Sequence, residues 1–176
     1  MSTIGFQNSC SDAAVFFRHG EKGQAIIGAA VDDLTITVPN LSIIQGIKDN
    51  LNQIFKMKDL REIHWLLNLK IERDFSDKTI SISQETYIDK IVKKFNLQDA
   101  KNCSTPLDPN IKLSKDQFPN SYEEKKAMTK FPYWQAIGSL MWATVATRPD
   151  IAFAVSVLLQ FLENPGRIHW ETVKRS

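Results

Sequence analysis

The chain has 176 residues, of which 43% are hydrophobic and 24% are charged, and its formal net charge is +2. These fractions are typical of a folded globular protein and exclude wholesale disorder. We expect neither a membrane span nor a signal peptide, because the sequence has no apolar run of about 18 residues and no basic N-terminal stretch followed by an apolar one.

A hairpin is predicted over residues 25–38, with two adjacent aspartates at its tip. Residues 25–31 form a short apolar run, and residues 34–38 alternate apolar and β-branched polar side chains, the period of a half-buried strand. This pattern places Asp32 and Asp33 at an exposed turn. Paired carboxylates suit a divalent metal that also binds substrate phosphates. Asp is equally an ordinary turn residue, so the pair alone leaves both interpretations open.

A helix is predicted directly after this hairpin, and a turn over residues 19–23 directly before it. Residues 43–55 place apolar side chains at helical spacing. Asn40 or Ser42 is a suitable N-cap, since both side chains accept hydrogen bonds from the first turn. We expect this helix to pack on the sheet.

A second hairpin is predicted next. Residues 63–71 alternate apolar and polar side chains, residues 74–78 form a turn, and the alternation returns at Ile80 and Ile82. We expect Trp65 to belong to the core of this hairpin and not to form an exposed stacking surface.

An amphipathic helix follows over residues 87–95, with Ser83 as a suitable N-cap. Its polar face carries Lys90, Lys93 and Lys94. These lysines suit a nucleic-acid backbone, although a solvated helix face is the more usual explanation for such a pattern.

Residues 102–132 contain four prolines and no sustained period, which indicates a linker or long loop. Helices are predicted over residues 134–145 and 151–162, with Pro149 in the first turn of the second helix. Residues 164–166 end that helix.

Charge and cysteine placement narrow the function classes only slightly. Residues 1–88 have a net charge of −2 and residues 89–176 a net charge of +4. A basic C-terminal half fits a nucleic-acid partner, and a surface of mixed charge explains the same count. Cys10 and Cys103 lie far apart without a CxxC partner and the three histidines are scattered, so the sequence indicates neither a zinc site nor a disulfide framework.

Taken in order, these segments resemble the reverse transcriptase of copia-type long-terminal-repeat retrotransposons over essentially the whole chain. Ala30-Val31-Asp32-Asp33 stands where that family has Tyr-Val-Asp-Asp, and Ile82-Ser83-Gln84 resembles its entry to the thumb. The other matching segments are Gly5-Phe6, Met57-Lys58-Asp59-Leu60, Cys103-Ser104-Thr105-Pro106, Pro132-Tyr133, Ile137-Gly138-Ser139-Leu140-Met141 and Thr147-Arg148-Pro149-Asp150-Ile151-Ala152.

The chain also departs from this family. The full enzyme begins upstream, with fingers and a palm strand that supplies another metal-binding aspartate, and we find no candidate for it before Asp32. Ala30 replaces a tyrosine, and Arg61 and Asn68 replace glycines. Asn tolerates a positive φ better than most residues, whereas Arg tolerates it poorly.

The resemblance implies an α+β fold. It implies a partial palm over residues 1–83, with antiparallel hairpins and one packing helix, and a thumb-entry helix over residues 84–101. A linker over residues 102–132 and a helical thumb or connection region over residues 133–176 would follow, truncated before a ribonuclease H domain.

The implied activity is that of an RNA-directed DNA polymerase, a nucleotidyltransferase that uses Mg²⁺ or Mn²⁺. Asp32 would be the principal metal ligand, with Asp33 as its partner. Adjacent strand residues point to opposite faces, so both can bind metal only if the turn breaks the alternation. Two carboxylates without a third ligand hold Mg²⁺ weakly, so we expect the isolated chain to be inactive.

The implied partners are an RNA template–DNA primer duplex, deoxynucleotides, and the remaining polymerase and ribonuclease H segments, in a cytoplasmic retrotransposon particle. Residues expected to grip the primer are Trp65, Leu66, Leu67 and Asn68, and those expected along the duplex backbone are Lys90, Lys93 and Lys94. Two alternatives stay open. One is a decayed or repurposed module that binds nucleic acid or a protein partner, and the other is a piece that does not fold stably because its sheet has an unpaired edge.

Overall fold

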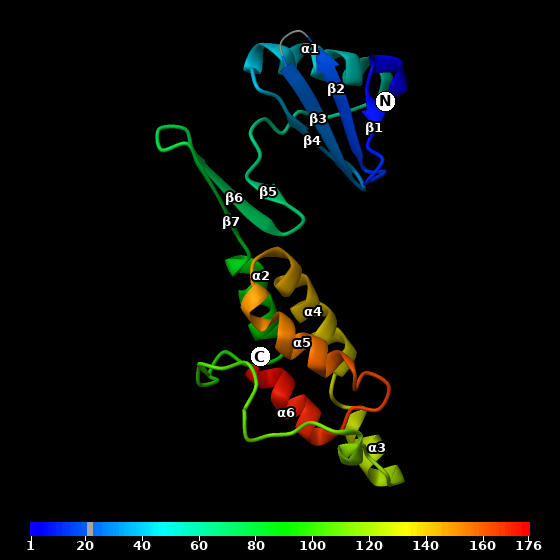
Figure 1. Cartoon of the computed structure of the whole chain (residues 1–176), viewed down its shortest axis with the longest axis vertical. Coiled ribbons are helices and arrows are strands. Elements are labelled where there is room, and N and C mark those ends of the chain that lie inside the picture. Colours follow the sequence, from blue (N-terminus) through cyan, green and yellow to red (C-terminus); the bar gives the residue numbers. More distant parts are fainter. Residues whose placement is uncertain (21–22) are drawn as a thin grey trace. The chain divides into compact units, whose positions relative to one another are not determined.

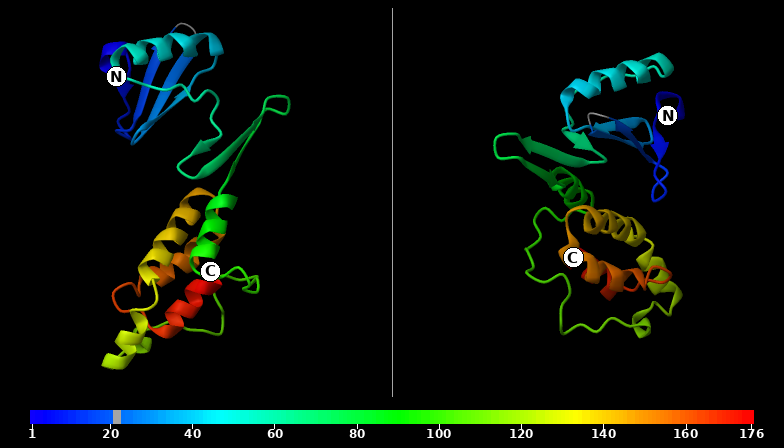
Figure 2. Two further views of the ribbon diagram at one scale, coloured as in Figure 1. Left: turned by 180° about the vertical axis from the view of Figure 1, so that it is seen from behind. Right: turned by 45° about the horizontal axis from the view of Figure 1, so that its top comes forward.

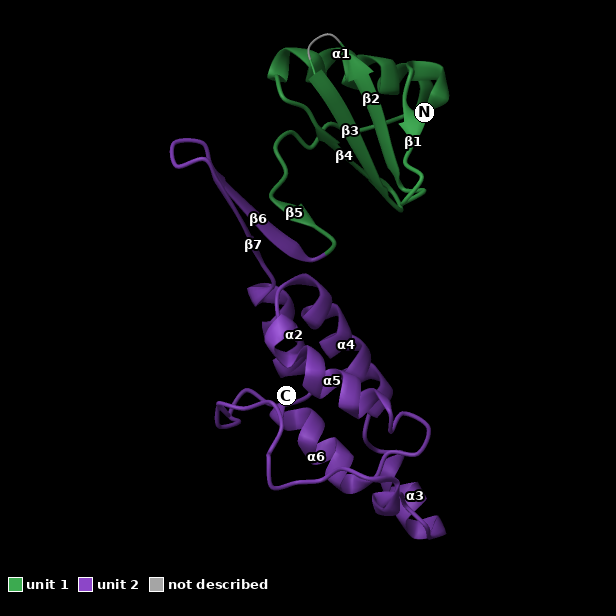
Figure 3. Ribbon diagram, viewed as in Figure 1, with its two compact units in different colours: residues 1–67 green, residues 68–176 purple. Residues whose placement is uncertain are grey.

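The computed structural model describes residues 1–20 and 23–176, which form two compact units, Met1–Leu67 and Asn68–Ser176 (Figure 3). The chain mixes helices with antiparallel sheets, as the α+β prediction required. The turn predicted over residues 19–23 includes residues 21 and 22, which lie outside the described residues. Among the described helices, none has both the length and the apolar character needed to cross a membrane.

The first unit contains a four-stranded antiparallel sheet with strand order β1-β2-β3-β4 (Figure 1). A short 3₁₀ helix, Ser2–Ile4, precedes it. The elements of the unit are β1 (Gln7–Asn8), β2 (Val15–Gly20), β3 (Gly23–Ala30), β4 (Asp33–Thr37), α1 (Leu41–Ile54) and β5 (Trp65–Leu66).

The register of β3 decides which side chains meet α1. Ala25 and Ile27 are buried, whereas Ile26 between them is 38% exposed, as the period of two in a strand requires. Helix α1 lies along one face of the sheet (Figures 1 and 2). Fully burying an aliphatic side chain stabilises a fold by about 1.5–3 kcal/mol, so this face dominates the stability of the unit. The buried cluster also contains Phe6, Ile47 and Leu51.

Helix α1 begins where the sequence predicts. The Asn40 side chain accepts a hydrogen bond from the Ser42 amide at 3.0 Å, which satisfies one of the unpaired N–H groups of the first turn. Asn40 is therefore the N-cap, and the expected packing of this helix on the sheet is confirmed.

The second unit consists of a hairpin followed by helices. Residues 102–132, which we expected to form a linker or long loop, contain α3 and the 3₁₀ helix Lys115–Gln117. A further 3₁₀ helix, Pro149–Ile151, leads into α5 and has proline at its first position, as predicted. The main elements are β6 (Leu69–Asp74), β7 (Thr79–Ser83), α2 (Glu85–Lys94), α3 (Tyr122–Met128), α4 (Tyr133–Ala146), α5 (Ala152–Leu159) and α6 (Arg167–Arg175).

Helices α4, α5 and α6 enclose the core of the second unit. The Tyr133 hydroxyl donates a hydrogen bond to the Leu158 carbonyl at 2.9 Å, so this buried phenol is satisfied across the α4–α5 contact. Phe131 stacks on Trp170 of α6, with ring centroids 5.4 Å apart. The residues buried in this cluster are Tyr133, Ala136, Ile137, Leu158, Trp170 and Val173.

A fully buried histidine lies in the first turn of α6. The Gly166 amide donates to His169 Nδ1 at 2.9 Å, so the His169 side chain pairs the amide of the N-cap residue, and the ring stacks on Phe161 at 4.1 Å between centroids. Burial lowers the pKa of His169, and a weaker contribution from the backbone of Ser114 opposes this shift. A Cβ on Gly166 would lie 2.1 Å from the Gln117 carbonyl oxygen, so only glycine fits at this cap.

We expect the stability of the chain to fall as the pH drops below the unfolded histidine pKa of about 6.5. The pKa of His169 is lowered in the folded state, so the unfolded state binds the proton more tightly, and this stabilisation is complete only above that pH. Urea unfolding between pH 7.5 and 5 would measure the loss. His169→Gln keeps the cap acceptor and should remove this pH dependence, whereas His64→Gln, at an exposed histidine, should retain it. An unchanged pH profile in His169→Gln would contradict the prediction.

Candidate functional site

The two aspartates lie at the tip of the β3–β4 hairpin. Ala30 pairs with Asp33, which leaves Val31 and Asp32 as a two-residue loop. Asp32 is therefore a loop residue and Asp33 is the first residue of β4, and both are exposed. The turn interrupts the strand alternation between them, which is the condition that two adjacent carboxylates must meet to serve one site.

Val31 carries backbone strain at this tip. Its φ is +55° and its side chain is 99% exposed, so no burial compensates for the conformation. A positive φ at the first loop residue alone is the pattern of a type II′ turn, where glycine is preferred. A β-branched residue in this region is a true outlier, and such outliers cluster at functional turns.

A third carboxylate is not positioned with this pair. The Ala29 amide donates to the Ala14 carbonyl at 2.8 Å, so the β1–β2 loop containing Asp12 lies at the same end of the sheet as Asp32 and Asp33 (Figure 1). Asp12 instead accepts a hydrogen bond from the Ala14 amide at 2.8 Å. Within residues 1–20 and 23–176, no three His, Cys, Asp or Glu side chains are grouped to hold a metal ion. Carboxylate oxygens are the type of ligand that Mg²⁺ prefers. The two carboxylates of Asp32 and Asp33, however, supply fewer ligands than a stable Mg²⁺ site uses.

The residues predicted to grip a primer lie around a turn. β5 ends at Leu66 and β6 begins at Leu69, and Leu67 and Asn68 between them have φ values of +50° and +65°. The continuous strand that we predicted over residues 63–71 is therefore wrong, because the turn interrupts the alternation. The core placement of Trp65 is also wrong, since its side chain is 54% exposed.

Arg61 and Asn68 are the two residues that we expected to replace glycines, and both have a positive φ, +66° at Arg61. The Arg61 amide donates to Asp59 Oδ1 at 2.8 Å, and Lys48 binds the same carboxylate at 2.9 Å. These hydrogen bonds, from Lys48 first and then from the Arg61 backbone, lower the pKa of Asp59. The backbone conformation therefore persists at Arg61 although the residue suits it poorly.

The polar face of α2 is exposed and basic at its C-terminal end. Lys90, Lys93 and Lys94 are all exposed, while Glu85 and Asp89 occupy the N-terminal half of the same helix. Lys93 and Lys94 lie in the last turn, where cations also stabilise the negative end of the helix dipole. The three lysines make this end of the helix positively charged, and part of this charge stabilises the helix itself.

Sequence reasoning missed Gln84, which immediately precedes α2. We predicted Ser83 as the N-cap; its hydroxyl accepts from the Glu85 amide at 3.2 Å, but the N-cap residue is Gln84. Gln84 is only 2% exposed and makes no side-chain hydrogen bond to its own helix. Glutamine usually lies on the surface, so no periodic pattern signals a buried one.

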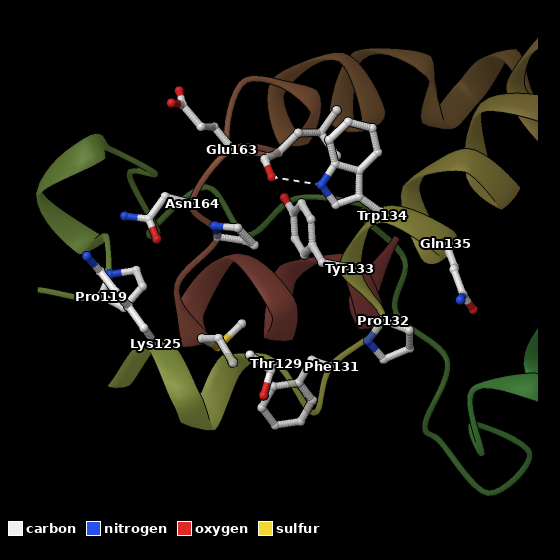
Figure 4. Close-up of a pocket in the computed structure, with 13 residues that line it drawn as sticks. Pro119, Lys125, Thr129, Phe131, Pro132, Tyr133, Trp134, Gln135, Glu163 and Asn164 are labelled. Carbon is white, nitrogen blue, oxygen red and sulfur yellow. Dashed lines mark hydrogen bonds between the residues drawn. The ribbon is translucent and has the colours of Figure 1, made fainter. Parts of the chain in front are cut away.

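A pocket of about 360 Å³ lies among α3, the start of α4 and residues 162–165 (Figure 4). The Trp134 indole N–H donates to the Leu162 carbonyl at 3.1 Å on its wall. Lys125 and Glu163 contribute the charged groups of the lining. None of the predicted site residues lines this pocket, so we assign no polymerase chemistry to it.

Comparison with known proteins identifies relatives for almost the whole chain. A family model described as reverse transcriptase (RNA-dependent DNA polymerase) matches residues 1–109. The chain is 43% identical over 175 residues to the retrovirus-related Pol polyprotein from transposon TNT 1-94 of Nicotiana tabacum, and 34% identical over 173 residues to that from transposon RE1 of Arabidopsis thaliana. A transposon Ty5-1 protein of Saccharomyces cerevisiae is 31% identical over 175 residues.

These matches cover 98–99% of this chain but only part of each relative. The chain spans 13% of the tobacco polyprotein, 11% of the Arabidopsis polyprotein and 54% of the yeast protein. No solved structure matches the chain.

Replacing Arg61 by glycine should stabilise the first unit. A left-handed conformation costs a non-glycine residue about 1–2 kcal/mol, part of which is offset by the greater freedom of glycine in the unfolded chain. Because Arg61 is exposed, Arg61→Gly should raise the free energy of unfolding by up to about 1 kcal/mol, as measured by urea denaturation. Glu62→Gly is the matched control, since Glu62 is also exposed and does not have a positive φ, and it should destabilise. Equal losses in both variants would contradict the prediction.

Proposed function

The chain belongs to the reverse transcriptase (RNA-dependent DNA polymerase) family of copia-type retrotransposons, and we propose that it is a palm-and-thumb portion of such a polymerase. In this proposal residues 1–83 form a partial palm, residues 84–101 the thumb entry, residues 102–132 a linker, and residues 133–176 the thumb or connection region. The observation that carries it is the two-residue β3–β4 turn, which presents Asp32 and Asp33 together at an exposed tip.

Asp32 would be the principal ligand of a divalent cation in this role, and Asp33 its partner. Asp32 and Asp33 would hold Mg²⁺ or Mn²⁺ at the tip, and the bound cation would supply Lewis-acid activation of a primer 3′-hydroxyl and charge neutralisation for the pyrophosphate leaving group. Both side chains are exposed, so they are available to a metal that keeps substrate phosphates among its ligands. The strained Val31 conformation holds Asp32 outside the strand alternation.

The partner we propose is an RNA template–DNA primer duplex. The exposed Trp65 and the turn at Leu67 and Asn68, with Leu66 before it, would contact the primer strand. The basic end of α2 would follow the duplex backbone, because neutralising phosphates releases condensed counterions. The lysines concerned are Lys90, Lys93 and Lys94.

We propose that the isolated chain is catalytically inactive and depends on other polymerase and ribonuclease H segments, in a cytoplasmic retrotransposon particle. A repurposed module that only binds nucleic acid is the second candidate. It is favoured by Ala30 in place of a tyrosine and by the two carboxylates without a grouped third ligand among the described residues.

Primer extension on an RNA template should give no incorporation by this chain at any Mg²⁺ or Mn²⁺ concentration. Two exposed carboxylates are too few to retain a hard, strongly hydrated cation. The test compares the unsubstituted chain with a double variant, Asp32→Ala with Asp33→Ala, and with Asp77→Ala as an exposed aspartate away from the tip. Incorporation that disappears in the double variant and survives in Asp77→Ala would contradict the proposed inactivity and identify a working catalytic hairpin.

Binding to an RNA–DNA duplex should weaken steeply with salt. Each lost phosphate contact lowers the log–log salt slope by about 1, so Lys93→Gln should reduce it by about that amount. Lys126→Gln, at an exposed lysine on α3, is the matched control and should leave the slope unchanged. Filter binding over a salt series from about 50 to about 300 mM, which brackets physiological ionic strength, measures both slopes. Salt-independent binding would argue for a protein-binding module instead.

A further inference from the structure

Gln84 occupies the single position between the β6–β7 hairpin and α2. β7 ends at Ser83 and α2 begins at Glu85, so any change in the direction of the helix relative to the hairpin passes through this residue. Its side chain is turned away from the helix that it precedes and is 2% exposed. A buried amide is costly unless its donors and acceptor are all paired, so its partners define its position closely.

Those partners all belong to the end of α4. In the orientation of the amide that satisfies both ends, the Gln84 oxygen accepts from Trp142 Nε1 at 3.1 Å, and its nitrogen donates to Thr147 Oγ1 at 2.6 Å and to the Ala143 carbonyl at 3.2 Å. One turn further along α2, the Tyr87 hydroxyl donates to the Ser139 carbonyl at 3.2 Å. Two points of attachment on successive turns fix the direction of α2 against α4.

Residues 143–151, which include the α4 partners Ala143 and Thr147 of Gln84, form a rigid segment. We call the set of contacts between Gln84 and α4 the joint. The Thr147 amide donates to the Ala143 carbonyl at 3.0 Å. Arg148 binds Asp150 through two hydrogen bonds of 2.8 and 2.7 Å, a bidentate geometry that fixes the guanidinium. Ile151 is 2% exposed and belongs to a buried cluster with Ala143 and Val155. Gln84 is thus bound to a segment whose own hydrogen bonds and burial restrict its movement.

We propose that Gln84 is a positioning residue for nucleic-acid binding: its contacts with Trp142, Ala143 and Thr147 fix the start of α2, and so the direction of the basic face of α2, relative to α4. This inference rests on the proposed duplex binding, and it assigns a structural role to the segment Thr147-Arg148-Pro149-Asp150, which holds one partner of Gln84. Lys90, Lys93 and Lys94 share one rigid helix, so loss of the joint would leave the lysines together but misdirect them as a group.

The test is duplex binding by Gln84→Met, which keeps the length and burial of the side chain and removes its three hydrogen bonds. Below the melting transition, we expect this variant to bind an RNA–DNA duplex about tenfold more weakly than the unsubstituted chain, with a salt slope smaller by about 1. Gln98→Met, at an exposed glutamine beyond α2, is the matched control and should bind normally. Thr147→Val removes one of the three hydrogen bonds from the α4 side and should weaken duplex binding in the same direction, which keeps the test valid if Gln84→Met folds poorly.

A merely structural role gives a different result. It would lower the melting temperature and the fraction of binding-competent protein while leaving the salt slope of the folded fraction unchanged, and that outcome would overturn the inference. Normal affinity and slope in folded Gln84→Met or Thr147→Val would overturn it as well. Absence of salt-dependent binding by the unsubstituted chain would instead overturn the proposed function, and the inference with it.

Discussion

The register of β3 is the constraint on which the first unit depends. Because side chains alternate along a strand, one register sends Ala25 and Ile27 into the α1 face and leaves Ile26 at the surface. The same register pairs Ala30 with Asp33 and so fixes the length of the loop at two residues. A slip by one residue would expose the core side chains and move the aspartates within the turn, so the burial of the sheet and the chemistry of its tip are determined together.

Backbone strain is present in both regions for which we propose a function, as it is at Arg61, Lys78 and Asn96. Val31 at the hairpin tip, and Leu67 and Asn68 at the primer-grip-like turn, all have positive φ values. Such conformations persist in non-glycine residues only where the surrounding structure determines them. Arg61 shows the same persistence, since its amide is held by Asp59 although its side chain disfavours the conformation.

In the second unit, buried polar side chains connect the helices. Tyr133 joins α4 to α5, Gln84 joins the start of α2 to the end of α4, and His169 caps α6 from within the core. The Tyr133 hydroxyl, the Gln84 amide and His169 Nδ1 each have a hydrogen-bond partner, because an unpaired polar group in this interior costs free energy, whereas His169 Nε2 is buried without one. Several segments that carry the family resemblance therefore connect helices to one another. Thr147 is the clearest example, since it is hydrogen-bonded to Gln84, which is 63 residues away in the sequence.

The sequence by itself determined the β3–β4 hairpin with its aspartates, a cap at Asn40 or Ser42 and the helices over residues 134–145 and 151–162, because these follow from local periodicity and capping. The α+β class followed from the resemblance of the sequence to a known family. Only the tertiary structure decided that a turn at Leu67 and Asn68 interrupts the alternation after Ile63, that Trp65 is exposed, and that Gln84 and His169 are buried. A two-residue turn between two strands keeps the alternation of apolar and polar residues in phase. The sequence pattern is therefore the same for one continuous strand and for two strands joined by such a turn. The burial of a polar side chain depends on partners that are distant in the sequence, which no local pattern contains.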